Sequence, residues 1–377
     1  MKKILFFIES LAGGGAEKVL SDIVSNLDTE KYEVTVCTVS DEGIYQDKVE
    51  KCSKYYAFLK CADYRAGGIR KILYWLKMKL IYALPSRIVY RYFIREKYDV
   101  EVAFVEGFAT KIISASNNSE SKKVAWIHCD MEKHPHADRR YKSLQEHCEA
   151  YEQFDKIVCV SQTAKVSFEE KFFASEKICV QYNPVDSIDI KAKTMESIDL
   201  VANPMLQLGT VGRLEQPKGY VRLVKCLGEL YRKGYQFAMW IIGEGTQRTQ
   251  IEEYIVEQSL EDIVKLVGFQ SNPYKYLGKC DAFVCSSYSE GFSTAATESL
   301  ILGKPVFTVE CSGMQELFGD EDCGEIVPNN DKSLYDMLER VVSGVIKPID
   351  YQLAVQKRAE DFSITKRIKE IEAILDS

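Results

Sequence analysis

The sequence predicts an α/β protein of two tandem, doubly wound, Rossmann-like domains with a cleft between them. Three observations support this fold class. Short apolar runs rich in β-branched and aromatic residues alternate with longer polar stretches of helical pattern, which is typical of parallel sheets. The alternation occurs as two separate series along the chain. A length of 377 residues is enough for about two or three domains.

The expected strands define the domain boundaries. The first series comprises residues 3–9, 32–39, 100–106, 122–128, 156–161 and 177–183. The second comprises residues 206–213, 237–244, 263–269, 281–287, 305–310 and 324–328. Residues 183–204 between them are polar and have prolines at both ends, which indicates a linker. We therefore expect domains over 1–185 and 186–355, and a C-terminal helix over 356–377 that packs back on the first domain.

Composition and charge exclude several classes of protein. The apolar run in "MKKILFFIE" is too short for a signal peptide, and no uncharged apolar segment approaches the ~18 residues of a spanning helix. The twelve cysteines are scattered without a C-x-x-C pair, which predicts buried free thiols in a cytoplasmic protein. The net charge is −7, yet residues 65–97 carry nine Lys/Arg and one acid. One basic block in an acidic chain indicates a specific anionic partner and argues against general nucleic-acid binding.

The basic block has a helical pattern. Apolar residues recur every four positions at Ile72, Leu76, Leu80 and Leu84. The surrounding cations include Arg70, Lys71, Lys77 and Lys79. This pattern suits a helix that lies on an anionic membrane surface. A solvated helix packed on a core is the alternative.

A glycine-rich turn follows the first expected strand in "IESLAGGGAEKVL", residues 8–20. Successive glycines let the backbone approach a ligand closely, and the helix that follows favours an anion at its N-terminus. Lys18 stands where a dinucleotide fingerprint needs its third glycine, which argues against NAD. The alternative is a tight turn without a ligand.

A second loop, "GTVGRLEQPKGY" over residues 209–220, places Arg213 at the end of a strand and Lys218 five residues later. Two cations at the carboxyl end of a strand can neutralise a diphosphate. A solvated pair of surface cations is the alternative.

The segment "SSYSEGFSTAATESLILGKPV", residues 286–306, contains two carboxylates around a turn. Glu290 lies in the turn, and Glu298 lies about five residues into the following helix, roughly 7–8 Å along its axis. The amides that begin this helix can bind phosphate oxygens and belong to Phe292, Ser293 and Thr294. The alternative is an acid that caps the helix and an ordinary glutamate on its surface.

His128 ends an expected strand in "VAWIHCDMEKHPH", so we expect it to be a polar residue of a binding site. A satisfied core histidine is the alternative. A metal site with His134 and His136 is disfavoured because the spacing matches no standard ligand set.

Taken together, these segments resemble the retaining nucleotide-sugar glycosyltransferases of family four, which have the GT-B fold. The resemblance covers nearly the whole chain and rests on "GGGAEK", "WIHCD", "VGRLEQPKGY", "IIGEGTQR", "LVGFQSNPYKYL", "SEGFSTAATESLILGKPV" and "CSGMQEL". The last two segments are similar to a subgroup found in bacterial capsule, exopolysaccharide and lipopolysaccharide clusters.

The resemblance implies an acceptor-binding first domain and a second domain that binds the nucleotide sugar. Arg213 and Lys218 would hold the donor diphosphate. Glu290 would contact hydroxyls of the donor sugar, and Glu298 those of the ribose. The remaining implied site residues are His128 near the reacting carbon, Gly14 at a phosphate or the acceptor, Gly268 and Phe269 beside the base, and Gly291, Phe292, Ser293 and Thr294 in the turn. Many family members carry Gly-Leu at positions 293–294, so different donor-sugar contacts are possible here.

The resemblance also implies the reaction and its partners. A hexosyl unit would move with retention through an oxocarbenium-like state, and the leaving diphosphate would help to deprotonate the acceptor. No metal would be needed, because the cations and helix dipoles neutralise the leaving group. The implied partners are a UDP-sugar, a lipid-linked saccharide acceptor and the inner face of the cell membrane, where the protein would be peripheral. A non-catalytic partner subunit and an epimerase or phosphorylase on the same fold are the alternatives.

Overall fold

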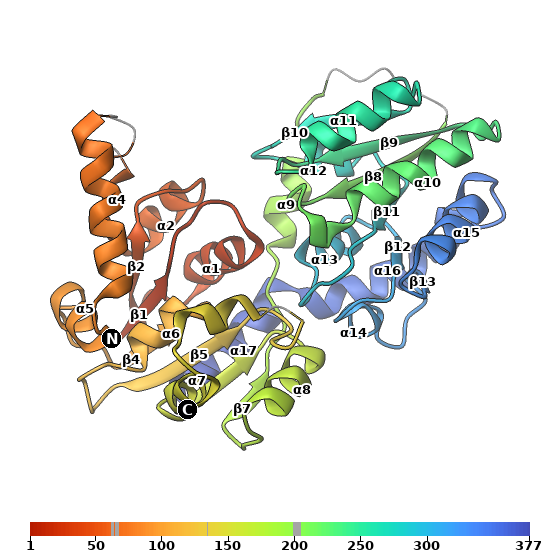
Figure 1. The fold of residues 1–377 in the computed structure, drawn as a ribbon. Coiled ribbons are helices and arrows are strands. Elements are labelled where there is room, and N and C mark those ends of the chain that lie inside the picture. The colour runs from red at the N-terminus through yellow and green to blue at the C-terminus, as the bar shows by residue number, and fades with distance from the viewer. Residues whose placement is uncertain (62–63, 65–67, 134, 199–204) are drawn as a thin grey trace. The chain divides into compact units, whose positions relative to one another are not determined.

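The computed structural model describes residues 1–61, 64, 68–133, 135–198 and 205–377 (Figure 1). Parts of the expected basic block (65–67) and of the expected linker (199–204), together with His134, lie outside these ranges. The chain forms two compact units. The first unit contains Met1–Pro184 and Thr365–Ser377, and the second contains Val185–Ile364. None of the helices within the described ranges combines the length and the hydropathy that a membrane span requires.

The first unit is built on a seven-stranded sheet with the order β3-β2-β1-β4-β5-β6-β7. All its strand pairs are parallel. The strands are β1 (Lys2–Ile8), β2 (Tyr32–Ser40), β3 (Lys54–Leu59), β4 (Val100–Ala103), β5 (Lys122–Ile127), β6 (Lys156–Cys159) and β7 (Ile178–Val180). The central strands are buried along almost their whole length, as parallel strands covered on both faces must be.

The helices of the first unit connect these strands. They are α1 (Gly15–Asn26), α2 (Gln46–Cys52), α4 (Gly68–Ala83), α5 (Ser86–Phe93), α6 (Phe108–Ile113), the 3₁₀ helix η1 (Pro135–Arg140), α7 (Leu144–Glu152), α8 (Gln162–Lys171) and, from the C-terminus, α17 (Ile364–Asp376). Figure 1 shows α4 at the periphery of this unit.

The second unit has a six-stranded parallel sheet with the order β10-β9-β8-β11-β12-β13. The strands are β8 (Leu206–Val211), β9 (Phe237–Ile242), β10 (Val264–Gly268), β11 (Ala282–Cys285), β12 (Val306–Val309) and β13 (Gly324–Val327). The helices are α9 (Ser187–Lys193), η2 (Gln216–Lys218), α10 (Tyr220–Arg232), α11 (Arg248–Glu257), α12 (Tyr274–Leu277), α13 (Thr294–Ile301), α14 (Met314–Phe318), α15 (Asp331–Val342), η3 (Pro348–Tyr351), α16 (Gln352–Ala359) and η4 (Glu360–Phe362).

These sheets confirm the predicted fold class, since every expected strand has a counterpart. The sequence analysis missed β3, the edge strand of the first sheet. Its residues "KYYAFL" are mostly half-buried and follow α2 after a single residue, so no apolar run with clear boundaries indicated a strand.

The C-terminal segment also differs from the expected single helix over 356–377. It consists of α16, η4 and α17. The last of these packs within the first unit, where Lys2 Nζ lies 3.0 Å from Asp376 Oδ1 and the Tyr32 hydroxyl lies 2.8 Å from Asp376 Oδ2. Residues up to Ile364, including α16, belong to the second unit.

Candidate active site

The central feature of the second unit is an ion pair between Lys218 and Glu290. Lys218 ends η2, and Glu290 lies in the turn after β11. Lys218 Nζ lies 2.7 Å and 2.8 Å from the two Glu290 carboxylate oxygens. Burial opposes the charge of Lys218, but the Glu290 carboxylate outweighs burial and raises the pKa of this lysine. The sequence predicted both residues for one site, and the structure brings them into direct contact.

Neighbouring groups fix this ion pair. The Ser287 hydroxyl donates to Glu290 Oε1 at 2.6 Å, so the carboxylate is held from two sides. The Ser286 hydroxyl donates to the Lys218 carbonyl at 3.1 Å. Gly219 has a φ of +68°, and a side chain there would collide with the Ser286 carbonyl. A glycine is therefore required for the loop of Lys218 to lie against the end of β11.

Glu298, the second acid, is the fifth residue of α13, as the sequence predicted. It is not an ordinary surface glutamate, because it is only 5% exposed. The buried Tyr274 hydroxyl donates to Glu298 Oε1 at 3.0 Å. Because a buried carboxylate needs hydrogen-bond partners, Tyr274 restricts the orientation of Glu298.

Helix α13 begins at Thr294. The sequence analysis expected the helix to begin at the amides of Phe292 and Ser293, one or two residues earlier. Ser293 is the N-cap, and its hydroxyl accepts from the Ala296 amide at 3.3 Å. Phe292 is buried, with its ring 5.9 Å from that of Phe362. The turn is tightly packed, because a side chain at Gly313 would lie 2.6 Å from the Gly291 carbonyl oxygen.

Other predicted donor residues lie at the ends of neighbouring strands. Arg213 follows β8 and is exposed. The positive charge of Arg213 lowers the pKa of Lys218, but the Glu290 carboxylate raises it by more, so the net shift is upward. Gly268 ends β10 with a φ of +79°, and the Phe269 side chain after it is 51% exposed. These residues lie on the same edge of the sheet as the turn of Glu290, since parallel strands share the direction of their carboxyl ends.

His128 and Gly14 belong to the first unit. His128 follows β5, and its ring nitrogen Nε2 is buried without a hydrogen-bond partner in the described part of the chain. Burial lowers the pKa of His128 to about 4, so the ring is neutral at pH 7. Gly14 is the N-cap of α1 and has no side chain to cap the helix.

The sequence analysis missed a carboxylate that holds the His128 backbone. Glu106 follows β4 and accepts the amides of His128 and Cys129, the latter at 2.9 Å. Burial raises the pKa of Glu106, while these amides oppose the rise.

Ser287 is a second residue that the sequence analysis missed, and its place in the same motif as Glu290 was a signal that could have found it. No sequence signal connects Glu106 to His128, or Tyr274 to Glu298, because these partners are separated by about 20 residues and meet only through the sheet order.

The predicted membrane residues form what we call the α4 surface. Its cations are Arg70, Lys71, Lys77 and Lys79, all exposed. Its apolar side chains are Ile69, Ile72, Leu73, Trp75, Leu76 and Leu80, each 49–76% exposed. The buried residues of the helix are Tyr74 and Ile81. The predicted stripe therefore faces away from the core over most of its length, and Leu84 lies beyond the end of the helix, partly buried.

No group of three or more His, Cys, Asp or Glu side chains within the described ranges is arranged to hold a metal ion.

Comparison with known proteins identifies the family. Residues 13–187 match the model of "Glycosyltransferase Family 4", and residues 201–357 match that of "Glycosyl transferases group 1". The chain belongs to the family 4, group 1 glycosyltransferases. The two matches cover one half of this glycosyltransferase each. The family is a retaining one, which confirms the resemblance seen in the motifs.

Relatives of this glycosyltransferase span its whole length. It is 29% identical over 374 residues to N-acetylgalactosamine-N,N'-diacetylbacillosaminyl-diphospho-undecaprenol 4-alpha-N-acetylgalactosaminyltransferase of Campylobacter jejuni, with 97% of each chain covered. It is 24% identical to the lipopolysaccharide 1,6-galactosyltransferase of Salmonella typhimurium, with 92% of this chain and 91% of that one covered.

Solved structures establish the GT-B fold. Anabaena HepE in complex with UDP and glucose superposes with a TM-score of 0.74 at 19% identity, with all of both chains covered. The lipopolysaccharide outer core galactosyltransferase WaaB superposes with a TM-score of 0.66 at 19% identity, with 98% of each chain covered.

Proposed function

We propose that this glycosyltransferase moves a hexosyl unit from a UDP-sugar to a lipid-linked saccharide in the synthesis of a bacterial cell-surface polysaccharide. The observation that carries the proposal is the Lys218–Glu290 pair at the carboxyl edge of the second sheet, beside the start of α13. A cation, a carboxylate and the N-terminus of a helix together suit a ligand that has both phosphates and hydroxyls.

In the second unit, Lys218 and Arg213 bind the donor diphosphate. Glu290 accepts hydrogen bonds from hydroxyls of the donor sugar, and its two oxygens can bridge a hydroxyl and the lysine. Glu298 accepts from the ribose hydroxyls, and its contact with Tyr274 at 3.0 Å pre-orients it. Because these groups are already fixed by hydrogen bonds, little ordering is needed when the donor binds.

The base and the phosphates also contact two turns of the second unit. The turn at Gly268 and Phe269 flanks the base, and the exposure of Phe269 leaves its ring available for stacking. The segment from Gly291 to Thr294 supplies amides to the phosphates.

In the first unit, His128 contacts the donor sugar near the reacting carbon, and Gly14 contacts a phosphate or the acceptor. A neutral His128 supports this role, because an uncharged ring places no positive charge beside a developing oxocarbenium ion.

The chemistry follows from these groups. As the bond between the anomeric carbon and the diphosphate oxygen breaks, positive charge grows on the sugar ring and negative charge grows on the diphosphate. Lys218 and Arg213 stabilise the negative charge as it develops. The departing phosphate oxygen takes the proton of the acceptor hydroxyl, which attacks from the same face, so the configuration is retained. Glu290 remains a sugar ligand throughout, unlike the paired catalytic carboxylates of glycosidases.

The choice of donor and acceptor is supported by the relatives. HepE was solved with UDP and glucose, and the name of the Campylobacter jejuni relative includes a diphospho-undecaprenol acceptor. Several relatives are named for lipopolysaccharide or O-antigen biosynthesis, which supports a polysaccharide pathway.

A screen of sugar nucleotides tests the proposal. UDP-glucose, UDP-galactose, UDP-N-acetylglucosamine, UDP-N-acetylgalactosamine and GDP-mannose are compared by thermal shift, and the donors that stabilise the protein are then assayed for slow hydrolysis without acceptor. We expect one or two UDP-sugars to raise Tm and to release UDP. Stabilisation by none of them, or by GDP-mannose alone, would contradict the proposed donor.

We further propose that the α4 surface binds the anionic inner face of the cell membrane and keeps the enzyme near its lipid-linked acceptor. At about 100° per residue, Ile69, Ile72, Leu73, Leu76 and Leu80 fall within roughly 60° of one line along the helix. The buried Tyr74 and Ile81 lie on the other side of the helix, so anchoring to the first unit leaves this apolar line exposed.

Cations flank the apolar line. With a rotation of about 100° per residue along the helix, Arg70 and Lys77 lie on one side of the apolar line and Lys79 lies on the other. A helix with an apolar face between two rows of cations can bury the apolar side chains among lipid tails while the cations meet anionic headgroups. Each such cation contributes about 1 kcal/mol near an anionic surface.

Sedimentation with liposomes tests this surface. Charge reversal at Arg70, Lys71, Lys77 and Lys79 should abolish binding to phosphatidylglycerol vesicles, and Leu76→Ser with Leu80→Ser should weaken it even at low salt. The matched control reverses four exposed lysines elsewhere, namely Lys225, Lys279, Lys347 and Lys369. If the control lost as much vesicle binding as the fourfold charge reversal in α4, the net charge alone would account for binding, against the proposal. Unchanged vesicle binding in both the charge-reversal variant and the Leu76→Ser, Leu80→Ser variant would also refute it.

A further inference from the structure

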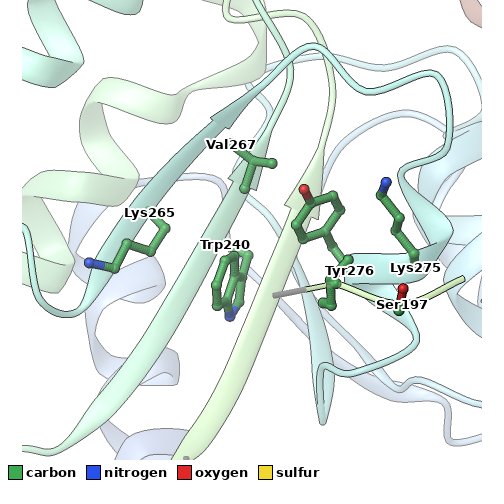
Figure 2. Close-up of a pocket in the computed structure, with 7 residues that line it drawn as sticks. Ser197, Trp240, Lys265, Val267, Lys275 and Tyr276 are labelled. Atoms are coloured by element: carbon green, nitrogen blue, oxygen red, sulfur yellow. The ribbon is translucent and has the colours of Figure 1, made fainter. Parts of the chain in front are cut away.

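The second unit has a pocket of about 500 Å³ that is not lined by Lys218, Glu290 or Glu298, although its lining residue Val267 directly precedes Gly268. We call it the β9–β10 pocket. It is lined by Ser197, Ile198, Trp240, Lys265, Val267, Lys275 and Tyr276. Figure 2 shows Trp240 and Tyr276 at its centre, with Lys265 and Lys275 on opposite sides of the two rings.

The pocket exists because helices cover one face of the sheet incompletely. In the strand register, Gly209 of β8, Trp240 of β9 and Lys265 of β10 are neighbours, so they point to the same face. A side chain at Gly209 would collide with Cys280 and lie 3.0 Å from Leu277 of α12. The four-residue α12 thus covers β8 and leaves β9 and the edge strand β10 open on this face.

Two aromatic rings form the floor of the pocket. The Trp240 and Tyr276 centroids are 6.0 Å apart, and their planes are inclined at 33°, so the rings adjoin rather than cover each other. Trp240 Nε1 donates to Gln207 Oε1 at 2.9 Å, which fixes the indole. A partly buried tryptophan whose polar atom is already satisfied presents only its apolar face to a ligand.

The polar groups around the rings are donors. The Lys275 ammonium lies 5.7 Å from the Tyr276 ring centroid, whereas the Lys265 ammonium points away from the rings and donates to the Glu261 carbonyl (Figure 2). No acidic side chain is among the described lining residues, although Lys275 forms an ion pair with Glu196, with its Nζ 3.9 Å from Oε2. The Tyr276 and Ser197 hydroxyls have no hydrogen-bond partner within the described ranges, and Figure 2 shows both near the Lys275 side of the rings. The pocket therefore offers the Lys275 ammonium and two hydroxyls beside an apolar platform, with Lys265 at its edge.

We propose that the β9–β10 pocket binds an acidic saccharide, with a pyranose ring stacked on Trp240 and Tyr276. Lys275 holds one carboxylate, and the exposed Lys265 side chain leaves the Glu261 carbonyl and turns toward the platform to hold another. The C–H face of a pyranose is apolar and suits an aromatic platform, while its hydroxyls need partners such as Tyr276 and Ser197. Cations on both sides of the platform suit a chain of charged sugar rings better than a single nucleobase.

This site is separate from the donor site and does not depend on it. Trp240 and Lys265 lie within their strands, before the carboxyl ends. Neither the ion pair of Lys218 and Glu290 nor Glu298 contributes to the lining. A second saccharide site would let the enzyme hold a charged glycan chain while the transfer reaction proceeds elsewhere, which goes beyond the function proposed above.

Binding of trigalacturonic acid to the full-length protein tests the proposal. We expect saturation-transfer NMR signals from its ring protons, and much weaker ones from the neutral trisaccharide maltotriose. Lys265→Glu and Lys275→Glu should each raise Kd about tenfold or more. Trp240→Ala should abolish binding, whereas Trp240→Phe should keep part of it. The matched control is Lys332→Glu, at a side chain that is 85% exposed, and it should bind as the wild type does.

Other outcomes would overturn the assignment. The proposal fails if trigalacturonic acid gives no saturation transfer, if maltotriose binds equally well, or if the lysine variants bind normally. Displacement by UMP would mean that the pocket belongs to the nucleotide. Glu290→Gln separates the two proposals, because it should leave trigalacturonic acid binding unchanged even if donor binding is lost.

Discussion

Neutralising one partner of the Lys218–Glu290 pair should destabilise the second unit by an amount that can be estimated. Glu290 is 9% exposed, and the Lys218 side chain is 29% exposed. Exposed ion pairs contribute about 0–1 kcal/mol, and breaking a fully buried pair costs about 3–5 kcal/mol. Since this pair lies between those limits, we expect Lys218→Met and Glu290→Gln each to lower the free energy of unfolding by about 2 kcal/mol.

Thermal unfolding and a transfer assay separate the structural role of the pair from its catalytic role. In a domain of this size, 1 kcal/mol shifts Tm by about 2–4 °C, so each single variant should melt about 4–8 °C lower. The double variant leaves no unpaired charge, and its loss should be smaller than the sum of the single losses by about 1–2 kcal/mol. Sugar transfer should be abolished in all three variants, because the donor needs both groups.

A matched control uses the exposed pair of Lys332 and Asp336, whose nitrogen and oxygen are also 2.8 Å apart. Lys332→Met and Asp336→Asn should each change the free energy of unfolding by no more than about 0.5 kcal/mol. Strictly additive losses at Lys218 and Glu290 would refute the estimate for the pair. Full transfer activity in either folded single variant would refute the assignment of the donor site.

Three further predictions follow from individual contacts. Burial lowers the pKa of His128 and His147 from 6.5 to about 4. The stability that their neutral forms give is therefore complete above pH ~6.5 and is lost as pH falls towards 4, at up to about 1.4 kcal/mol per pH unit for each histidine. Free energies of unfolding measured by chemical denaturation at several pH values should fall less steeply with decreasing pH in His147→Phe than in the wild type. An equally steep fall would contradict this prediction. Tyr274→Phe should weaken UDP binding by about 5–10-fold in calorimetry, because Glu298 loses its orienting bond, and equal affinity would argue against that role. Ser293→Ala should cost about 1 kcal/mol of stability through loss of the helix cap, whereas Ser293→Asn should be close to the wild type, and equal Tm values for the two would show that the cap is unimportant.

The fold could be predicted because its signal is local. Most central strands contain a short apolar run bounded by polar residues, as in residues 124–127 of β5, and such runs report burial on both faces of a parallel sheet. The edge strand β3 could not be predicted, because a strand with one neighbour is only partly buried and its sequence "KYYAFL" loses the continuous pattern. Strand order likewise depends on which faces pack together, and that information is spread over the whole chain.

The candidate site could be predicted as a set of residues but not as a set of contacts. Glu290, Glu298 and Lys218 stand in recognisable motifs with a chemical reason for each residue type. Their neighbours Tyr274 and Ser287 act through hydrogen bonds of their hydroxyl groups, which any tyrosine or serine in the sequence could make. Only the three-dimensional arrangement distinguishes these two from the other tyrosines and serines of the chain.

Helix α4 explains why an apolar period in a sequence does not reveal which side faces the core. Residues spaced by four, such as Ile72, Leu76 and Leu80, would suit a buried stripe equally well. The structure anchors the helix instead through Tyr74, whose hydroxyl lies 2.9 Å from the Ser40 hydroxyl, and through Ile81. Met78 and Tyr82 also pack against the core from this side of the helix. The apolar stripe on the other side is left exposed, and exposing so much apolar surface is unfavourable in water. The exposure supports the proposal that an apolar phase covers the stripe, and the adjacent cations are the reason that we propose an anionic membrane rather than a second protein surface.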